Sequence, residues 1–163
     1  MSTQNQHPPG ETREQSPSSL DLAVEVSERV ELVEVAAVSF RGQNSCLPGN
    51  ELKVKLKHNG RFESRQDDGK FSILTDFRFI AVDGEQSEDC LVELGLTMRL
   101  TYYCCDFGSI SEEHLVSFAQ LNGVFNAWPY WREYVQSALN RLGLPSFTVP
   151  VFRLADAQDD GGS

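Results

Sequence analysis

Histidines and cysteines are the residues of this sequence that could carry out nucleophilic or metal chemistry. Cys104 and Cys105 shortly precede His114, and a thiol activated by an imidazole is one way to build a nucleophile. Cysteines at the ends of strands are far more often structural, and the spacing places no second catalytic group beside His114. Cys46 and Cys90 have no companion at the spacing of a zinc site. We therefore expect no enzyme activity.

Composition narrows the class of protein further. The sequence has no phosphate loop, no GxGxxG motif and no metal-ligand spacing, which predicts no cofactor and no metal. The formal net charge of -10 disfavours nucleic acid and anionic membranes and favours basic partners. No stretch approaches the roughly 18 consecutive apolar residues of a membrane span. Without a CxxC pair or a signal-like amino terminus, the sequence predicts a reduced, cytoplasmic protein.

Aromatic residues are concentrated in one short run. The segment "FNAWPYWREY", residues 125–134, contains two tryptophans, two tyrosines and a phenylalanine, although only 10% of the chain is aromatic. Two interpretations are open: the buried face of an ordinary helix, and a surface that holds something apolar. Deciding between them requires the elements that position these side chains.

The central part of the sequence predicts an antiparallel sheet of four strands. Apolar and polar residues alternate in the segments that begin near Glu51, Lys70 and Cys90, as in strands with one buried face. We expect the first of these segments to reach a turn at Gly60. The segment from Val30 to Phe40, which comes before these three, is predicted to be the remaining strand, although a helix is an alternative. Its alternate positions Val30, Leu32, Ala36, Val38 and Phe40 are apolar and would share one face of the strand. Such a sheet requires a cover on its apolar face.

Two helices follow the strands and supply that cover. Ser109 precedes Glu112 by the spacing of a capping box and predicts a short helix that ends at Gly123. A long helix follows, with Pro129 at or near its first turn. Its apolar stripe comprises Trp131, Tyr134, Val135, Ala138, Leu139 and Leu142. The last apolar segment, "FTVPVF", is interrupted by proline and predicts an extended chain rather than a central strand.

The two ends of the sequence contrast with this domain. Residues 1–19 and 155–163 contain too little apolar surface to offset the entropy of ordering, so we expect disordered tails on either side of one domain, residues 20–154. The acidic end is interpreted as a solubilising tail, with a docking tail for a basic partner as the alternative.

Several runs resemble a known family. "NGVFNAW", "PYWREYV" and "RLGLPSFTVPVF" resemble the carboxy-terminal signature of the SecB family of protein-export chaperones, and "VAAVSFRGQN" is similar to its first strand. Pro129, Tyr130, Arg132 and Glu133 match the most specific motif. The resemblance implies a SecB-like α+β fold that assembles as a dimer of dimers, a homotetramer. It also implies a cytoplasmic, ATP-independent holdase that binds unfolded preproteins in apolar grooves, keeps them export-competent and delivers them to SecA, the Sec translocase motor.

The resemblance and the surplus of apolar residues together suggest site residues. Apolar grooves need broad contact area with few directional demands, and aromatic rings provide it. Near such a groove we expect Phe40, Phe125, Trp128, Phe147, Val149 and Phe152. For contacts between protomers we expect Val92, Leu94, Leu96, Trp131, Tyr134, Val135 and Ala138, with an ordinary intrachain core as the alternative for each. For docking to the translocase the matching residue is Glu93, on the outward parity of its strand.

Two departures from the family pattern affect these expectations. Ala37 and Arg41 stand where the family's first strand carries acids that help dock SecA, and no carboxy-terminal helix follows Phe152. An acidic cluster that could receive a basic partner, or simply form a solvated loop, comprises Asp83, Glu85, Glu88, Asp89 and Glu93. Two other functions stay open: a SecB-like chaperone dedicated to one client such as an antitoxin, and a small-ligand-binding or hydrolytic α+β domain.

Overall fold

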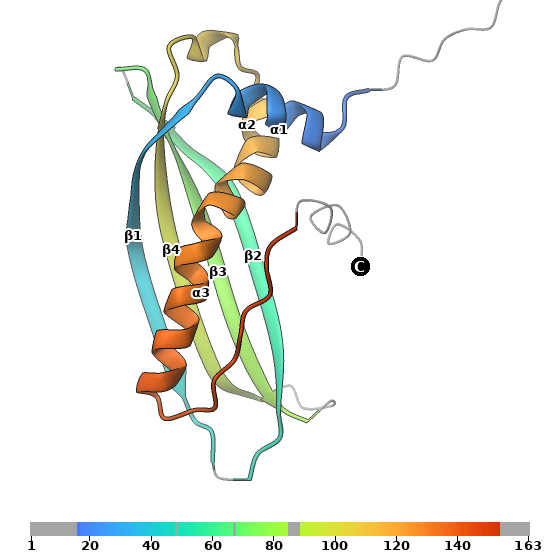
Figure 1. Ribbon diagram of the computed structural model, residues 1–163, viewed down its shortest axis with the longest axis vertical. Coiled ribbons are helices and arrows are strands. Elements are labelled where there is room, and N and C mark those ends of the chain that lie inside the picture. The colour runs from blue at the N-terminus through green and yellow to red at the C-terminus, as the bar shows by residue number, and fades with distance from the viewer. Residues whose placement is uncertain (1–15, 48, 67, 85–88, 154–163) are drawn as a thin grey trace, which may run out of the picture.

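A computed structural model describes residues 16–47, 49–66, 68–84 and 89–153 of the chain. The predicted tail at residues 155–163 and most of the one at residues 1–19 lie outside the described residues. The elements in chain order are α1 (Ser19–Ser27), β1 (Glu31–Asn44), β2 (Leu52–Arg65), β3 (Lys70–Asp83), β4 (Cys90–Tyr103), α2 (Glu112–Phe118) and α3 (Val124–Arg141) (Figure 1). None of the helices in the described ranges has the length and apolar character needed to cross a membrane.

The predicted four-stranded antiparallel sheet is confirmed. Its strand order is β1-β4-β3-β2, so β1 and β2 form the two edges. The connection from β1 to β2 crosses the full width of the sheet at one end (Figure 1). α3 packs lengthwise on one face, which we call the covered face, and the opposite side is the open face.

Two bulges change which residues of β1 face the helix. The register shifts between Leu32 and Glu34 and again between Ala37 and Ser39, so Val33 and Val38 are extra residues without a partner on β4. Each bulge reverses the alternation of side chains. The prediction of a single parity is therefore wrong. The residues opposite the inward side chains of β4 are Leu32, Val35, Ala37 and Phe40.

Gly60 lies within a strand, and the predicted turn there is wrong. β2 continues through Gly60 to Arg65, paired with β3. A Cβ atom on Gly60 would lie 2.0 Å from the carbonyl oxygen of Ala119. Glycine is required at this position because the helical backbone packs directly against the strand.

The first helix, α1, was not predicted. Ser18 and Asp21 form a reciprocal capping box, with the Ser18 hydroxyl accepting from the Asp21 amide at 3.2 Å. α1 buries Leu22, Ala23 and Val26 against the rest of the chain. The sequence does contain the capping residues Ser18 and Asp21 and the apolar residues that α1 buries. The strongly polar residues that precede them obscure this helix pattern.

The helical region after β4 is continuous, so the predicted break at Gly123 is wrong. Ser111, rather than Ser109, caps α2 by accepting from the His114 amide. A π-helical segment, Ala119–Gly123, then joins α2 to α3. A Cβ atom on Gly123 would lie 3.0 Å from Cγ2 of Ile73, so this glycine permits close packing on the sheet. Pro129 lies inside α3, and not at its start.

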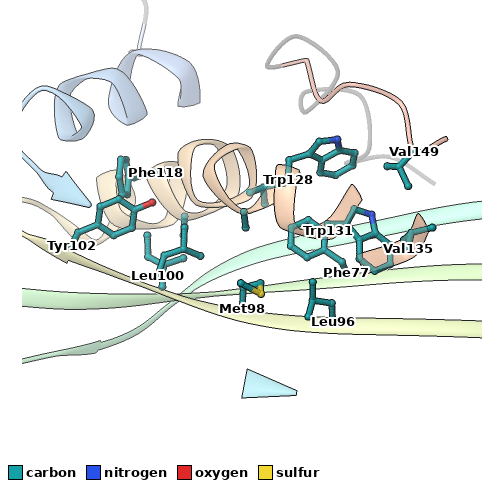
Figure 2. Packing of buried hydrophobic residues seen from close by; sticks show 14 of the residues in the cluster. Phe77, Leu96, Met98, Leu100, Tyr102, Phe118, Trp128, Trp131, Val135 and Val149 are labelled. Atoms are coloured by element: carbon teal, nitrogen blue, oxygen red, sulfur yellow. The ribbon is translucent and has the colours of Figure 1, made fainter. Parts of the chain in front are cut away.

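Side chains from α3 and the covered face form the core (Figure 2). The Trp131 ring stacks on Phe77 at 5.4 Å, and Phe118 meets Tyr102 edge to face at 5.0 Å. The alternation predicted for β3 and β4 is confirmed by the burial of Phe71, Ile73, Phe77 and Phe79 on β3 and of Val92, Leu94, Leu96, Met98, Leu100 and Tyr102 on β4. Burying each large apolar side chain stabilises the fold by about 1.5 to 3 kcal/mol.

Candidate functional site

An extended segment follows α3 and lies on the covered face. This strap, residues 145–152, runs between α3 and β2 (Figure 1). The Trp128 indole donates a hydrogen bond to the carbonyl of Pro150 at 2.8 Å, and Nε of Arg132 donates to the carbonyl of Val149 at 3.0 Å. The strap is thus held through its backbone carbonyls by two side chains of α3.

Apolar contacts complete the surface on which the strap lies. Phe147 meets Phe79 edge to face at 5.4 Å. Phe152 contacts the rings of Trp128 at 5.1 Å and His58 at 5.3 Å. Val149 is only 2% exposed. We call the surface formed by His58, Phe79, Trp128 and Arg132 the strap seat.

Four of the six residues expected at a client groove meet at this seat. Trp128 belongs to the seat, whereas Phe147, Val149 and Phe152 belong to the strap that occupies it. Phe40 lies elsewhere, on β1, where it contacts Tyr134 and is 67% exposed. Phe125 is 50% exposed on α3.

A pocket of about 700 Å³ opens where the strap begins. It lies between the β1–β2 connection, the start of β2 and the end of α3, and its apolar walls include Leu52, Val54, Phe79, Leu139, Leu142 and Phe147. Asn50 shapes the connection: its side chain accepts from the Leu47 amide and donates to Asp83, each at 2.7 Å. Leu47 itself is exposed at the rim.

A second pocket, of about 580 Å³, lies farther along β2 and was not anticipated from the sequence. Its apolar lining comprises Phe62, Phe107, Leu115 and Val116. Arg65 lies over the Phe107 ring at 4.6 Å, and Arg61 also lines the pocket. Because β2 contributes to both pockets and to the strap seat between them, apolar surface extends along most of this strand.

Most residues expected between protomers lie in the core of the single chain. Val92, Leu94, Leu96, Trp131 and Val135 are buried beneath or within α3, so their side chains present no surface to a second copy. The alternative of an intrachain core holds for these five. Tyr134 and Ala138 are half-buried, and the Tyr134 hydroxyl donates to the carbonyl of Arg41 at 2.6 Å.

Glu93 lies on the open face, in contact with two arginines. One carboxylate oxygen of Glu93 is 2.5 Å from Nη2 of Arg78 and 3.8 Å from Nη1 of Arg41. Ala37 lies opposite Met98, an inward residue, so it belongs to the covered face. The charge of Glu93 is therefore compensated within the chain.

The expected acidic cluster is only partly described. Asp83 accepts hydrogen bonds from the Asn50 side chain and the Glu51 amide. Glu85 and Glu88 lie outside the described residues. Asp89 is described and exposed, and the described acids Asp83 and Glu93 have the structural partners named above.

The His114 ring has polar contacts with two side chains, Glu25 and Ser111. Nε2 of His114 lies 3.0 Å from Glu25 of α1, and its Nδ1 lies 2.6 Å from the Ser111 hydroxyl. These contacts join α1 to the start of α2. The four cysteines, Cys46, Cys90, Cys104 and Cys105, form no disulfide.

The fold of this chain is similar to that of solved structures, although its sequence matches no family model. No protein-family model and no curated protein matches the sequence. The chain is similar to the SecB-like chaperone Rv1957 of Mycobacterium tuberculosis in complex with a ChAD peptide from the HigA1 antitoxin Rv1956, with a TM-score of 0.71 at 16% identity. This match covers 83% of the present chain and 98% of that chain. A protein of unknown function from Streptococcus agalactiae has a TM-score of 0.39 at 11% identity, covering 74% and 96% of the two chains. The sheet order and the long helix thus confirm the resemblance at the level of architecture: the chain has the SecB-like fold.

Proposed function

We propose that the protein is an ATP-independent chaperone that binds extended apolar segments of unfolded polypeptides on the strap seat and in the adjoining pocket. The observation that carries this proposal is the strap itself, an extended apolar segment held by hydrogen bonds to its carbonyls. Hydrogen bonds to backbone carbonyls place no demand on the side chains of the bound segment. The seat therefore has the chemistry to accept many sequences.

The apolar part of the seat supports the same function. Trp128 and Phe79 offer broad ring surfaces that contact phenylalanines of the strap without directional bonds. The pocket next to the strap has room for further large apolar side chains. In this proposal the strap is an internal occupant, and a client segment displaces it.

A binding experiment tests the chaperone proposal directly. The probe is a fluorescein-labelled model protein kept unfolded by reduction and blocked thiols, and the readout is anisotropy without ATP. We expect stoichiometric binding, competed by a synthetic peptide with the strap sequence "SFTVPVF". Replacing Phe147 and Phe152 with Ala weakens the hold of the strap and is expected to tighten client binding several-fold. Val151→Ala is the matched control, because Val151 is an exposed strap residue.

Two outcomes of this experiment would contradict different parts of the proposal. If no unfolded client binds the wild-type protein, the chaperone function is wrong. If clients bind but the Phe147→Ala/Phe152→Ala variant binds them more weakly, these rings line the client site as the sequence suggests, and the strap is not displaced.

A chaperone dedicated to one client is the second candidate. The similar Mycobacterium tuberculosis protein is described in complex with a peptide from an antitoxin. Comparing dissociation constants for a panel of unrelated unfolded proteins distinguishes the two candidates. Similar constants across the panel indicate a general holdase, and binding confined to one client indicates a dedicated chaperone.

Homo-oligomerisation is a further part of the proposal. β1 is an edge strand, and it exposes the apolar residues Leu32, Val33, Val38 and Phe40. Exposed apolar side chains on an unpaired edge favour association with a second copy. We propose that this edge, with Tyr134 and Ala138 of the neighbouring α3 surface, contributes to a dimer and thence to the homotetramer.

Delivery to SecA, which the resemblance to the SecB family implies, is disfavoured by the arginines around Glu93. A basic tail would have to dock near Glu93, whose carboxylate Arg78 and Arg41 already share. If such delivery occurs, Arg41→Glu should tighten SecA binding measurably at low salt, since it replaces a repulsive charge by an attractive one.

A further inference from the structure

The open face of the sheet carries exposed basic residues on three of its strands, β1, β2 and β3. Lys57 on β2 lies opposite Arg78 on β3, which lies opposite Gly95 on β4, which in turn lies opposite Arg41 on β1. Lys55 lies two residues before Lys57 on β2, so its side chain is on the same face of the sheet. All four charged side chains are exposed. We call Arg41, Lys55, Lys57 and Arg78 the basic row.

Within the part of the chain that the structure describes, the charges of the basic row are only partly balanced. Glu93 is the carboxylate that contacts the row, and it serves both Arg78 and Arg41. Among the described residues, Lys55 and Lys57 have no ion-pair partner. The excess of positive charge is confined to this part of the surface, whereas the chain as a whole has a formal net charge of -10.

Placing like charges opposite each other in a sheet is unfavourable for the free protein. Lys57 and Arg78 are direct cross-strand partners, and such pairs destabilise a sheet. A guanidinium group has five N–H donors, so a single shared carboxylate leaves most donors of Arg41 and Arg78 available. Between these two arginines Gly95 has no side chain, which gives a partner access close to the backbone.

Apolar side chains alternate with the basic ones on the same face. Ile80 lies between Lys55 and the acidic Glu93 in one row. Leu74 lies between Arg61 and Arg99 in another row, where Asp76 and Glu63 pair with these two arginines. Both Ile80 and Leu74 are half-buried. A surface that mixes cations with aliphatic side chains matches a polypeptide that mixes carboxylates with aliphatic side chains. Phosphodiester chains would leave Ile80 and Leu74 without apolar contacts, and the net charge of the chain repels them at long range.

We propose that the open face of the sheet binds an acidic polypeptide segment that also carries aliphatic side chains. The basic row receives the carboxylates of the segment, and Ile80 receives an aliphatic side chain. The basic row is positively charged, whereas a site for a basic tail would need negative charge. The row also lies on the other side of the sheet from the strap seat. The inference does not depend on the proposed chaperone function.

Fluorescence anisotropy with defined peptides tests the proposal on the full-length chain. The probe is a fluorescein-labelled peptide containing several Asp and Leu residues in a Ser/Gly background. One matched peptide has Asn in place of every Asp, and another has Ser in place of every Leu. We expect the first peptide to bind best and its affinity to fall several-fold as salt rises from about 50 to 200 mM.

Charge-matched variants locate the binding surface. Each exposed ion pair contributes up to about fivefold in affinity, so Lys55→Gln with Lys57→Gln should weaken binding by about tenfold. The control is Arg141→Gln with Arg153→Gln, which changes the net charge equally at exposed positions away from the open face. We expect this control to bind the peptide as the wild type does.

The remaining outcomes overturn the proposal. Equal weakening by both double variants would show that net charge alone governs binding. Tighter binding of a single-stranded oligonucleotide than of the acidic peptide would identify a different class of partner. If Asp156→Asn, Asp159→Asn and Asp160→Asn together raise the peptide affinity tenfold, the occupant is the chain's own acidic end, and a separate partner is wrong.

Discussion

Two tryptophans in α3 show how neighbouring residues of one type acquire different roles. Trp131 is fully buried and stacks on Phe77 with an interplanar angle of 14°. Trp128, one turn earlier, faces the strap and donates to the Pro150 carbonyl. Because positions i and i+3 are neighbours on a helix, both rings contact Phe77, but Trp128 also reaches the strap and so belongs to the core and to the seat. The aromatic run therefore serves both interpretations that the sequence left open.

Replacing these tryptophans should have unequal effects on stability. Trp131→Ala leaves a large cavity and should lower the free energy of unfolding by about 3 to 5 kcal/mol. Trp128→Phe retains a ring but removes the hydrogen bond to the strap, a loss of about 0.5 to 1.5 kcal/mol. Urea unfolding monitored by circular dichroism measures both. Equal losses would contradict the separation of roles.

Tyr102 should make the protein less stable at high pH. Burial raises the pKa of its hydroxyl to about 12, and the hydrogen bond from Asn126 opposes this shift only in part. The folded state therefore holds the proton more tightly than the unfolded state. The stabilisation is complete below about pH 10, the ordinary tyrosine pKa, and is lost as pH rises toward 12.

The comparison of two variants isolates this effect. Between about pH 9 and pH 11 the Tyr102 contribution to the free energy of unfolding should fall by about 1 kcal/mol. Tyr102→Phe should lack this part of the pH dependence, because it has no hydroxyl to ionise. Parallel pH profiles of wild type and variant would show that Tyr102 ionises alike in both states.

At the scale of elements, close backbone contacts determine how the helical region meets the sheet. α2, the π-helical segment and α3 run without a break although the sequence contains Gly123 and Pro129. Gly123 approaches Ile73 of β3, and Gly60 approaches Ala119 at the start of the π-helical segment. Both glycines thus serve packing between elements, because a side chain at either position would push the helix away from the sheet.

Gly60→Ala should destabilise the protein strongly. The added Cβ atom would lie 2.0 Å from a backbone oxygen, which cannot move without shifting the π-helical segment. Overpacking of this kind costs about 1 to 3 kcal/mol. Gly108→Ala is the control, since nothing lies within 4 Å of a Cβ atom there. Thermal and urea unfolding of both variants give the comparison, and a Gly60→Ala variant as stable as the control would contradict the contact.

At the scale of the whole molecule, three surfaces differ in their chemistry. One face of the sheet is covered by α3 and the strap, the other carries the basic row, and the β1 edge exposes apolar side chains. Residues at the centre of β4 are unavailable to a second copy because the chain buries them itself. Association should therefore depend on the edge and not on the core.

A pair of substitutions separates assembly from folding. We expect the wild type to have a native mass larger than one chain at micromolar concentration. Phe40→Asp places a charge on the exposed edge and should reduce the mass to one chain while circular dichroism stays unchanged. Leu94→Asp buries a charge and should unfold the protomer instead. A monomeric wild type would overturn the oligomer proposal.

The sequence by itself determined the order of the four strands and the long helix, the inward parity of β3 and β4 and the apolar stripe of α3. These features depend on local periodicity, which a strand or helix imposes on its own residues. The extended character of residues 147–152 was also predictable, since Pro150 prevents regular pairing.

Only the tertiary structure decided the remaining features. The bulges in β1 and the roles of Gly60 and Gly123 depend on which backbone lies opposite, and no local pattern contains that information. The strap occupies the seat, and Glu93 meets two arginines, because distant segments are brought together in space. The single sheet and helix already enclose Val92, Leu94 and Leu96, so apolar side chains that the sequence suggested for a subunit contact became the core of one chain.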